Sequence, residues 1–291
     1  MRVDEVFKQA ASQGTAPVSF EMFPPKGELT LNTAREVAGN LCKLSPSFVS
    51  VTCSAGGSGN GATTAPIAHM ITSEFNTPSV AHLTCVGRSH ADIAAKIDEY
   101  RSAGVENILA LRGDLPTGAT EDDKPASDYA YARDLIPELV DAGFCVGAAA
   151  YPEGHIACED LNASVEYLKQ KQDAGASFFV TQLFFDNDAF YRFRERAERA
   201  GVTAPLSCGI MPFMSKGQVS RMVFMCGVSL PAAIVRLLAR YEDDPASLRA
   251  AGIEYAAAQL CDLRDNGVSG LHLYTMNRPE VARSLVAALR G

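Results

Sequence analysis

Short apolar runs recur along this chain at intervals of roughly thirty residues, and stretches with helical patterning separate them. That interval is the length of one strand, its crossover helix and the connecting loops. The runs are continuous rather than alternating, which is typical of parallel strands covered on both faces. We predict eight strands, at Val18–Phe23, Phe48–Cys53, Val80–Cys85, Asn107–Arg112, Cys145–Tyr151, Phe178–Phe185, Leu206–Met211 and Gly270–Met276.

Helix signals lie in the intervals between these runs. Ser89 and Asp92 form a predicted capping box, and Gly104 is the expected end of that helix. Asp160 or Asn162 is the candidate N-cap of one later helix, and Asp186 or Asn187 is that of the next. A further helix is predicted over 128–142. The interval between the seventh and eighth runs is twice as long, and it contains additional helices, predicted at Met222–Cys226, Ala232–Tyr241 and Leu248–Asn266.

Eight such units without an internal boundary indicate a single (β/α)₈ TIM barrel, of the α/β class, that covers residues 1–291. The length of 291 residues fits this fold, and no linker rich in Gly, Ser or Pro divides the chain. We therefore expect one catalytic domain without a regulatory domain. An open doubly wound sheet remains the alternative, because spacing alone does not show that a sheet closes.

Charge and composition limit the function classes. Thirty-four acidic against 26 basic residues give a formal charge of −8, which disfavours nucleic acid as a partner. The N-terminus lacks the apolar segment of a signal peptide, and Pro231 and Arg236 interrupt the most apolar stretch, so we expect a cytoplasmic protein that does not span a membrane. The eight cysteines form no CxxC pair, which predicts free thiols and no metal site.

Polar residues gather where the predicted strands end, which is where a TIM barrel carries its chemistry. Glu21 stands among Phe20, Met22 and Phe23, and burial there would raise its pKa, as a general acid requires. The alternative is a structural ion pair. Gln182 falls inside a predicted strand and must find hydrogen-bond partners, either on a planar heterocycle or in the core.

The fourth predicted strand leads into Arg112, Gly113 and Asp114, which offer a fork of donors, a close backbone approach and a fixed negative charge. Asp114 is equally consistent with a plain ion pair. His82 and His155 have no partners at metal-ligand spacing, and His272 is expected in the core. The pattern predicts an enzyme that acts on a flat polar molecule, without identifying the reaction.

The motifs of this polar rim, in this order, resemble the methylenetetrahydrofolate reductase family. They extend over nearly the whole chain, and the chain's length resembles the short bacterial form. The matching segments are Phe-Glu-Met-Phe-Pro-Pro-Lys (20–26), His-Leu-Thr-Cys (82–85), Ala-Leu-Arg-Gly-Asp-Leu-Pro (110–116), Ala-Tyr-Pro-Glu-Gly-His (150–155), Lys-Gln-Lys-Gln-Asp-Ala-Gly-Ala (169–176), Thr-Gln-Leu-Phe-Phe-Asp (181–186), Gly-Ile-Met-Pro (209–212) and Leu-Tyr-Thr-Met-Asn-Arg (273–278).

The resemblance implies reduction of methylenetetrahydrofolate to methyltetrahydrofolate on non-covalent FAD, with FMN less expected. NADH or NADPH would reduce the flavin and leave before folate binds. Glu21 would be the general acid that protonates the bridging folate nitrogen, and Asp114 would favour the cationic iminium. We also expect a homo-oligomer, and a redox partner protein is a further possibility.

The same resemblance implies two sets of binding residues. The substrate side would comprise Gln182, Gln218 and Arg278. The cofactor side would comprise Thr52, Ala55, His82, Arg112, Gly113, Asp114, Tyr131, Ala132, Tyr151, His155 and Lys171.

The chain departs from the family pattern at four positions. They are Cys53, Ser164, Gln170 and Met222. These changes keep open a flavin- or folate-binding subunit that a partner protein reduces. A folate-binding methyltransferase barrel is a third alternative, which a lack of bound flavin would favour.

Overall fold

Eight parallel strands close into a barrel in a computed structural model, which describes residues 1–24, 31–53, 63–114, 125–158 and 160–291. Each strand pairs with its neighbours in sequence, and β1 also pairs with β8, so the predicted TIM barrel is confirmed and the open sheet is excluded. The strands are β1 (Val18–Met22), β2 (Phe48–Val51), β3 (Ser79–Thr84), β4 (Asn107–Leu111), β5 (Cys145–Ala150), β6 (Phe178–Thr181), β7 (Leu206–Ile210) and β8 (Gly270–Tyr274).

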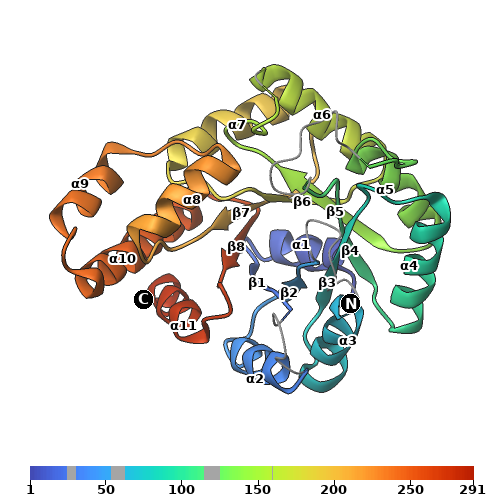
Figure 1. The fold of residues 1–291 in the computed structure, drawn as a ribbon, viewed down its shortest axis with the longest axis horizontal. Helices are drawn as coiled ribbons and strands as arrows, with labels where there is room; N and C mark the ends of the chain where they lie inside the picture. The colour runs from blue at the N-terminus through green and yellow to red at the C-terminus, as the bar shows by residue number, and fades with distance from the viewer. Residues whose placement is uncertain (25–30, 54–62, 115–124, 159) are drawn as a thin grey trace.

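Helices surround the strands on the outside (Figure 1). They bury their apolar faces against the outward-facing strand side chains, as the continuous apolar runs require. The helices that connect successive strands up to β7 are α2 (Leu31–Cys42), α3 (Thr64–Phe75), α4 (His90–Ser102), α5 (Ala132–Asp141), α6 (Leu161–Asp173) and α7 (Asn187–Arg199). Ser89 and Asp92 form the predicted capping box of α4, and Asp160 and Asp186 cap α6 and α7.

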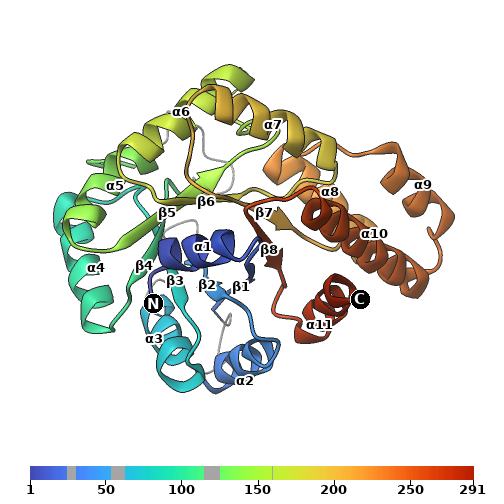
Figure 2. The ribbon, with the colours of Figure 1, turned by 180° about the vertical axis from the view of Figure 1, so that it is seen from behind.

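The long interval before β8 contains the additional helices that the sequence predicts. They are α8 (Lys216–Cys226), α9 (Ala232–Arg240) and α10 (Pro245–Asp265), and α11 (Pro279–Arg290) follows β8. The helices α8 and α9 extend to one side of the barrel in both views (Figures 1 and 2). Within the described residues, no helix is long and apolar enough to cross a membrane.

An N-terminal helix that the sequence analysis did not identify, α1 (Val3–Ser12), lies across one end of the barrel (Figure 2). Its Val3 and Phe7 pack against side chains from the strand starts, including Phe48 and Phe178. The backbone N–H of Val3 also donates to Asn107 at 2.8 Å. Because α1 closes the amino-terminal end, ligands have access to the barrel interior from the carboxyl end of the strands.

Candidate active site

The carboxyl ends of the strands surround a cleft of about 760 Å³. Because parallel strands end on the same side of a barrel, residues far apart in the sequence meet there. Nine of the predicted site residues line this cleft: Glu21, Thr52, His82, Arg112, Gly113, Asp114, Tyr151, His155 and Gln182. Both predicted acids are therefore brought to one cavity.

Glu21 faces the barrel interior, and this changes the surroundings expected for it. Consecutive side chains of a strand point to opposite faces, so Phe20 and Met22 are buried in the outer hydrophobic core. The Glu21 carboxylate instead lies 3.7 Å from Nε2 of His82 and 3.9 Å from Nε2 of His272. Two imidazoles thus lie within 4 Å of the carboxylate, which the sequence did not predict.

His82 is the more accessible of the two imidazoles, because it lines the cleft. Its Nε2 atom is buried, and no residue in the described part of the chain forms a hydrogen bond with it. Burial of the ring lowers the pKa of His82 to about 4, although the nearby Glu21 opposes this shift. His82 is therefore a neutral imidazole at physiological pH, and a buried, unpaired polar atom at the cleft floor fits contact with a polar ligand.

Tyr274 lines the cleft as well, although the sequence analysis gave it no role. Its hydroxyl donates to the carbonyl of Thr181 at 2.6 Å, and its ring lies against Gly209, where a Cβ would approach the ring within 2.6 Å. The pairing of β1 with β8 could have indicated a role for Tyr274, because it places this residue opposite Glu21. The Tyr274 hydroxyl beside Glu21 is thus bound to the backbone of β6.

Asp114 lies at the exposed rim of the cleft and affects groups on two other elements. Burial, and then the negative charge of Asp114, raise the pKa of Tyr151 to about 12 and that of Cys226 to about 11. The adjacent Gly113 has φ +91, and a Cβ there would come within 2.8 Å of Val86. A glycine is therefore required for the turn that brings Asp114 to the rim.

A second cavity of about 350 Å³ adjoins the cleft, and both are lined by Arg112, Tyr151 and His155. Its other lining residues include the predicted Tyr131, Ala132 and Lys171. The Lys171 ammonium donates to the carbonyl of Ala149 at 2.8 Å, and burial lowers its pKa to about 8. The cations Arg112 and Lys171 and the rings of Tyr131 and Tyr151 thus line one cavity. This combination suits a phosphorylated ligand with a flat ring.

Arg133 and Tyr167 also line this second cavity and were not predicted. The guanidinium of Arg133 lies 4.8 Å from the ring centre of Tyr131 and 5.7 Å from that of Tyr167. The sequence carries little signal for this cluster, because the residues belong to successive helices that only the barrel places side by side.

Of the three predicted substrate residues, only Gln182 lines the cleft. Gln182 follows β6 instead of lying inside a strand, and its Oε1 accepts from the backbone N–H of Leu183. Gln218 binds the turn before α8, because its Oε1 accepts from the backbone N–H of Met214 at 2.9 Å. Arg278 is the N-cap residue of α11, and it lines neither cavity. Ala55 lies outside the described residues.

Three of the four departures from the family pattern contact these cavities. Cys53 and Met222 line the cleft, and Ser164 lines the second cavity. Gln170 lines neither and accepts a hydrogen bond from Arg133. The departures therefore lie where they can affect the fit of a ligand.

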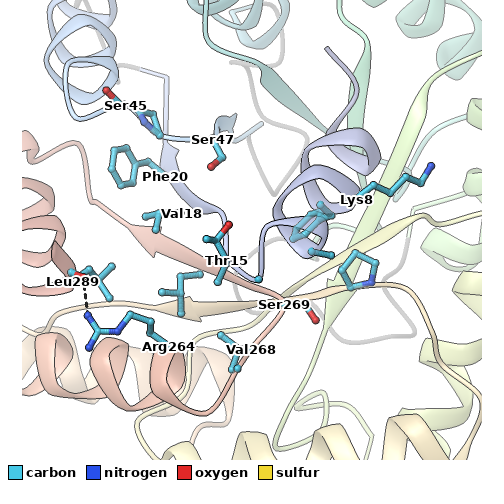
Figure 3. A pocket seen from close by; sticks show the side chains of 18 of the residues that line it. Lys8, Thr15, Val18, Phe20, Ser45, Ser47, Arg264, Val268, Ser269 and Leu289 are labelled. Carbon is cyan, nitrogen blue, oxygen red and sulfur yellow. Dashed lines mark hydrogen bonds between the residues drawn. The ribbon is translucent and has the colours of Figure 1, made fainter.

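A larger cavity, of about 1010 Å³, lies away from this site (Figure 3). It is lined by α1, by the segments that precede β1 and β8, and by the end of α11. Its basic side chains already have partners: Lys8 binds Asp4, Arg264 donates to Leu289, and Arg290 donates to Leu44. It has no counterpart of the unpaired imidazole beside Glu21, so we assign the chemistry to the cleft.

Comparison with known proteins gives the family. The sequence profile described as methylenetetrahydrofolate reductase matches residues 6–290. The chain belongs to this family. The 5,10-methylenetetrahydrofolate reductase of Escherichia coli is 34% identical over 280 residues, which are 96% of this chain and 93% of that protein.

The plant relatives of the methylenetetrahydrofolate reductase family are longer. Methylenetetrahydrofolate reductase (NADH) 1 of Arabidopsis thaliana is 32% identical over 95% of this chain but over 49% of its own length. A probable methylenetetrahydrofolate reductase (NADH) of Oryza sativa is 33% identical over 99% of this chain and 50% of its own length. The chain thus spans about half the length of these relatives.

The solved structures support the fold alone. A protein from Clostridium thermocellum, described as binding two copies of 5-methyl-5,6,7,8-tetrahydrofolic acid, has a TM-score of 0.58 at 13% identity, and the match covers 98% of this chain and 97% of that one. A phosphonopyruvate hydrolase has a TM-score of 0.55, also at 13% identity, over 100% of this chain and 85% of that one.

Proposed function

We propose that this protein reduces 5,10-methylenetetrahydrofolate to 5-methyltetrahydrofolate in a flavin-dependent, ping-pong reaction with NAD(P)H. In the net reaction NAD(P)H supplies the hydride and one proton is consumed, so that NAD(P)⁺ and the methyl product are released. The observation that carries the proposal is the convergence of Glu21, Asp114 and Gln182 on one cleft in a member of this family.

The shape and chemistry of the two cavities support FAD as the cofactor. The two cavities share lining residues: Glu21 and Asp114 line the cleft, and Arg112 and Lys171, which are suited to phosphates, line the second cavity. The aromatic side chains of the second cavity suit an adenine ring, which FMN lacks. When bound, the flavin would accept a hydride from the nicotinamide and pass it to the folate.

The residues of the chain then have defined tasks. Glu21 protonates the bridging nitrogen of the folate, so that the five-membered ring opens to an iminium. The charge of Asp114 at the rim favours this cation. Gln182, which lines the cleft, would hydrogen-bond the pterin or the nicotinamide amide, and Gln218 and Arg278 would bind the substrate.

The alternative is a flavin- or folate-binding subunit that a partner protein reduces. It is motivated by Cys53 and Met222, two of the departures from the family pattern, which line the cleft. The two functions differ in the first half-reaction, because the subunit would not accept hydride from a free nicotinamide. They share the folate half-reaction.

An anaerobic titration of the purified protein separates these functions. We expect a yellow protein whose flavin absorbance is bleached by NADH or NADPH and restored by methylenetetrahydrofolate. Bleaching by dithionite but not by either nicotinamide would favour the partner-reduced subunit. A protein that remains colourless after reconstitution with FAD and with FMN would contradict both. Extraction of the cofactor identifies FAD or FMN, and light scattering tests the expected homo-oligomer.

A further inference from the structure

Arg133 lines the second cavity, and the proposed reaction gives it no task. The family resemblance implies roles for its neighbours Tyr131 and Ala132 but not for Arg133 itself. It is the second residue of α5, and its side chain is 35% exposed. The guanidinium is therefore accessible to a ligand in this cavity and is not part of the hydrophobic core.

Contacts from two helices orient the Arg133 guanidinium. It lies 4.8 Å from the ring centre of Tyr131 and 5.7 Å from that of Tyr167, and both rings are nearly half exposed. One of its N–H groups donates to Oε1 of Gln170 on α6. An arginine has five N–H donors, so this bond leaves others for a ligand.

The adjacent carboxylate, Asp134, is committed to the backbone rather than to Arg133. One of its oxygens accepts from the backbone N–H groups of Ala130 and Tyr131 at 2.9 and 2.8 Å. The other lies 3.7 Å from Nε of Arg133, which is longer than a hydrogen bond. Asp134 therefore stabilises the start of α5 and leaves the donors of Arg133 available.

The second cavity gathers positive charge. Its described lining residues include Arg112, Arg133 and Lys171 but no aspartate or glutamate. Burial, and then the positive charge of Arg133, lower the pKa of Lys171 to about 8, so the two cations act on each other. At physiological pH both carry charge, and a bound anion relieves the repulsion between them.

The place of Arg133 indicates which part of a cofactor it meets. Arg133, Tyr131 and Tyr167 line the second cavity but not the cleft that holds Glu21. A flavin ring that reacts beside Glu21 would leave this wall to the rest of the cofactor. A guanidinium next to two accessible aromatic rings suits a phosphate that is attached to a second flat ring.

We propose that Arg133 determines a preference for FAD over FMN: its guanidinium binds the adenosine monophosphate half, which FAD has and FMN lacks. The inference rests on the proposed function and deepens it. Arg133 is a binding residue rather than a catalytic residue, because it lines only the second cavity. The departure from the family pattern at Gln170 then has a role, since its amide oxygen holds Arg133 in position.

Binding measurements on the flavin-free protein test the proposal without activity. FAD and FMN are titrated by the quenching of their fluorescence, and ADP is titrated by calorimetry. For Arg133→Gln we expect FAD to bind about tenfold more weakly, as for the loss of a charge-assisted hydrogen bond, and the affinity for FMN to change less than about twofold. ADP contains the adenosine monophosphate half without a flavin ring, so its affinity should fall as that of FAD does.

Two further variants serve as controls. Arg196→Gln replaces an exposed arginine of α7 that lines neither cavity, and it should leave all three affinities unchanged. Arg133→Lys keeps the charge but loses the planar fork of donors, so we expect a smaller loss of FAD affinity, of about threefold.

Equal weakening of FAD and FMN in Arg133→Gln would overturn the proposal, as would unchanged affinities for both. A wild-type protein that binds FMN as tightly as FAD would also overturn it, although a flavin-dependent reaction would stand. The proposed function fails in a different way. If the wild type binds ADP through Arg133 but binds neither flavin, the flavin reaction is refuted and the assignment of Arg133 to an adenosine phosphate is retained.

Discussion

Nε2 of His82 lies 3.7 Å from a carboxylate oxygen of Glu21 and has no hydrogen-bond partner in the described part of the chain. This pair joins β1 to β3 at the floor of the cleft. A neutral imidazole leaves the carboxyl without a permanent positive neighbour. The proposed acid therefore faces a neutral ring across the floor of the cleft rather than a fixed positive charge.

The burial of His82 predicts a loss of stability in acid. Its pKa falls from the usual 6.5 to about 4 on folding, so between these values the unfolded chain binds a proton that the folded chain does not. The free energy of unfolding should therefore rise from pH 4 to 6.5 and fall as the pH is lowered, by about 3 kcal/mol at most. Urea unfolding at pH 4.5 and 7 measures the difference.

Replacing the buried His82 and, separately, the exposed His69 isolates this effect. His82→Leu should reduce the difference between the two pH values, because the buried ring is gone. His69→Leu is the matched control, since His69 is exposed, and it should leave the difference unchanged. Equal pH dependence in wild type and His82→Leu would show that another group causes the acid sensitivity.

Glu21→Gln should separate the two half-reactions. An amide cannot deliver the proton, so we expect the folate half-reaction to slow by at least about 100-fold, within the usual range for a general acid. Flavin content and reduction by NADH should remain close to those of the wild type. Stopped-flow absorbance of each half-reaction provides the measurement, and Glu198→Gln, on the exposed side of α7, is the control. Folate reduction within a few-fold of wild type would exclude Glu21 as the acid.

Asp114→Asn should weaken folate binding and slow folate reduction, because the charge that favours the cationic iminium is removed. We expect an effect of about tenfold or more on the folate half-reaction, equivalent to about 1.4 kcal/mol. Rapid-mixing kinetics across folate concentrations separate binding from rate. Asp141→Asn replaces an exposed carboxylate of α5 and should have no effect. Unchanged folate kinetics in Asp114→Asn would remove this residue from the site.

Gly209→Ala should destabilise the barrel beside the cleft. A Cβ at this position would lie 2.3 Å from the Thr181 carbonyl and 2.6 Å from the Tyr274 ring, and a backbone carbonyl in a strand cannot move aside easily. We expect a loss of about 1–3 kcal/mol or more in the free energy of unfolding, measured with urea.

Gly217→Ala is the control for that substitution. Gly217 lies in α8, and a Cβ there would meet no atom within 4 Å. Its unfolding free energy should change by less than about 1 kcal/mol. Similar losses in both variants would show that the crowding around Gly209 is relieved at little cost.

Local chemistry made several features of this protein predictable. The capping box at Ser89 and Asp92 forms as expected, because both groups belong to one turn of chain. The eight strands occur where continuous apolar runs predict them, although β6 ends at Thr181, before Gln182. The motifs also carried the family resemblance, since they record the residues that a shared chemistry requires.

Contacts between segments far apart in the sequence could not be predicted from local patterns. The sequence placed Phe20 and Met22 beside Glu21, but strand alternation turns them outward and gives Glu21 the imidazoles of His82 and His272 as neighbours. The helix α1 was not predicted, although its buried residues Val3, Val6, Phe7 and Ala10 follow helical spacing, and only the tertiary structure shows that it closes the barrel.

The sequence by itself determined the repeated strand–helix unit, the family and the residue types available for catalysis. Closure of the barrel, the pairing of β1 with β8 and the placement of His272 beneath Glu21 were decided only by tertiary structure. The physical reason is that periodicity and capping act within a few residues, whereas strand register joins residues more than 250 positions apart, such as Ser19 and His272.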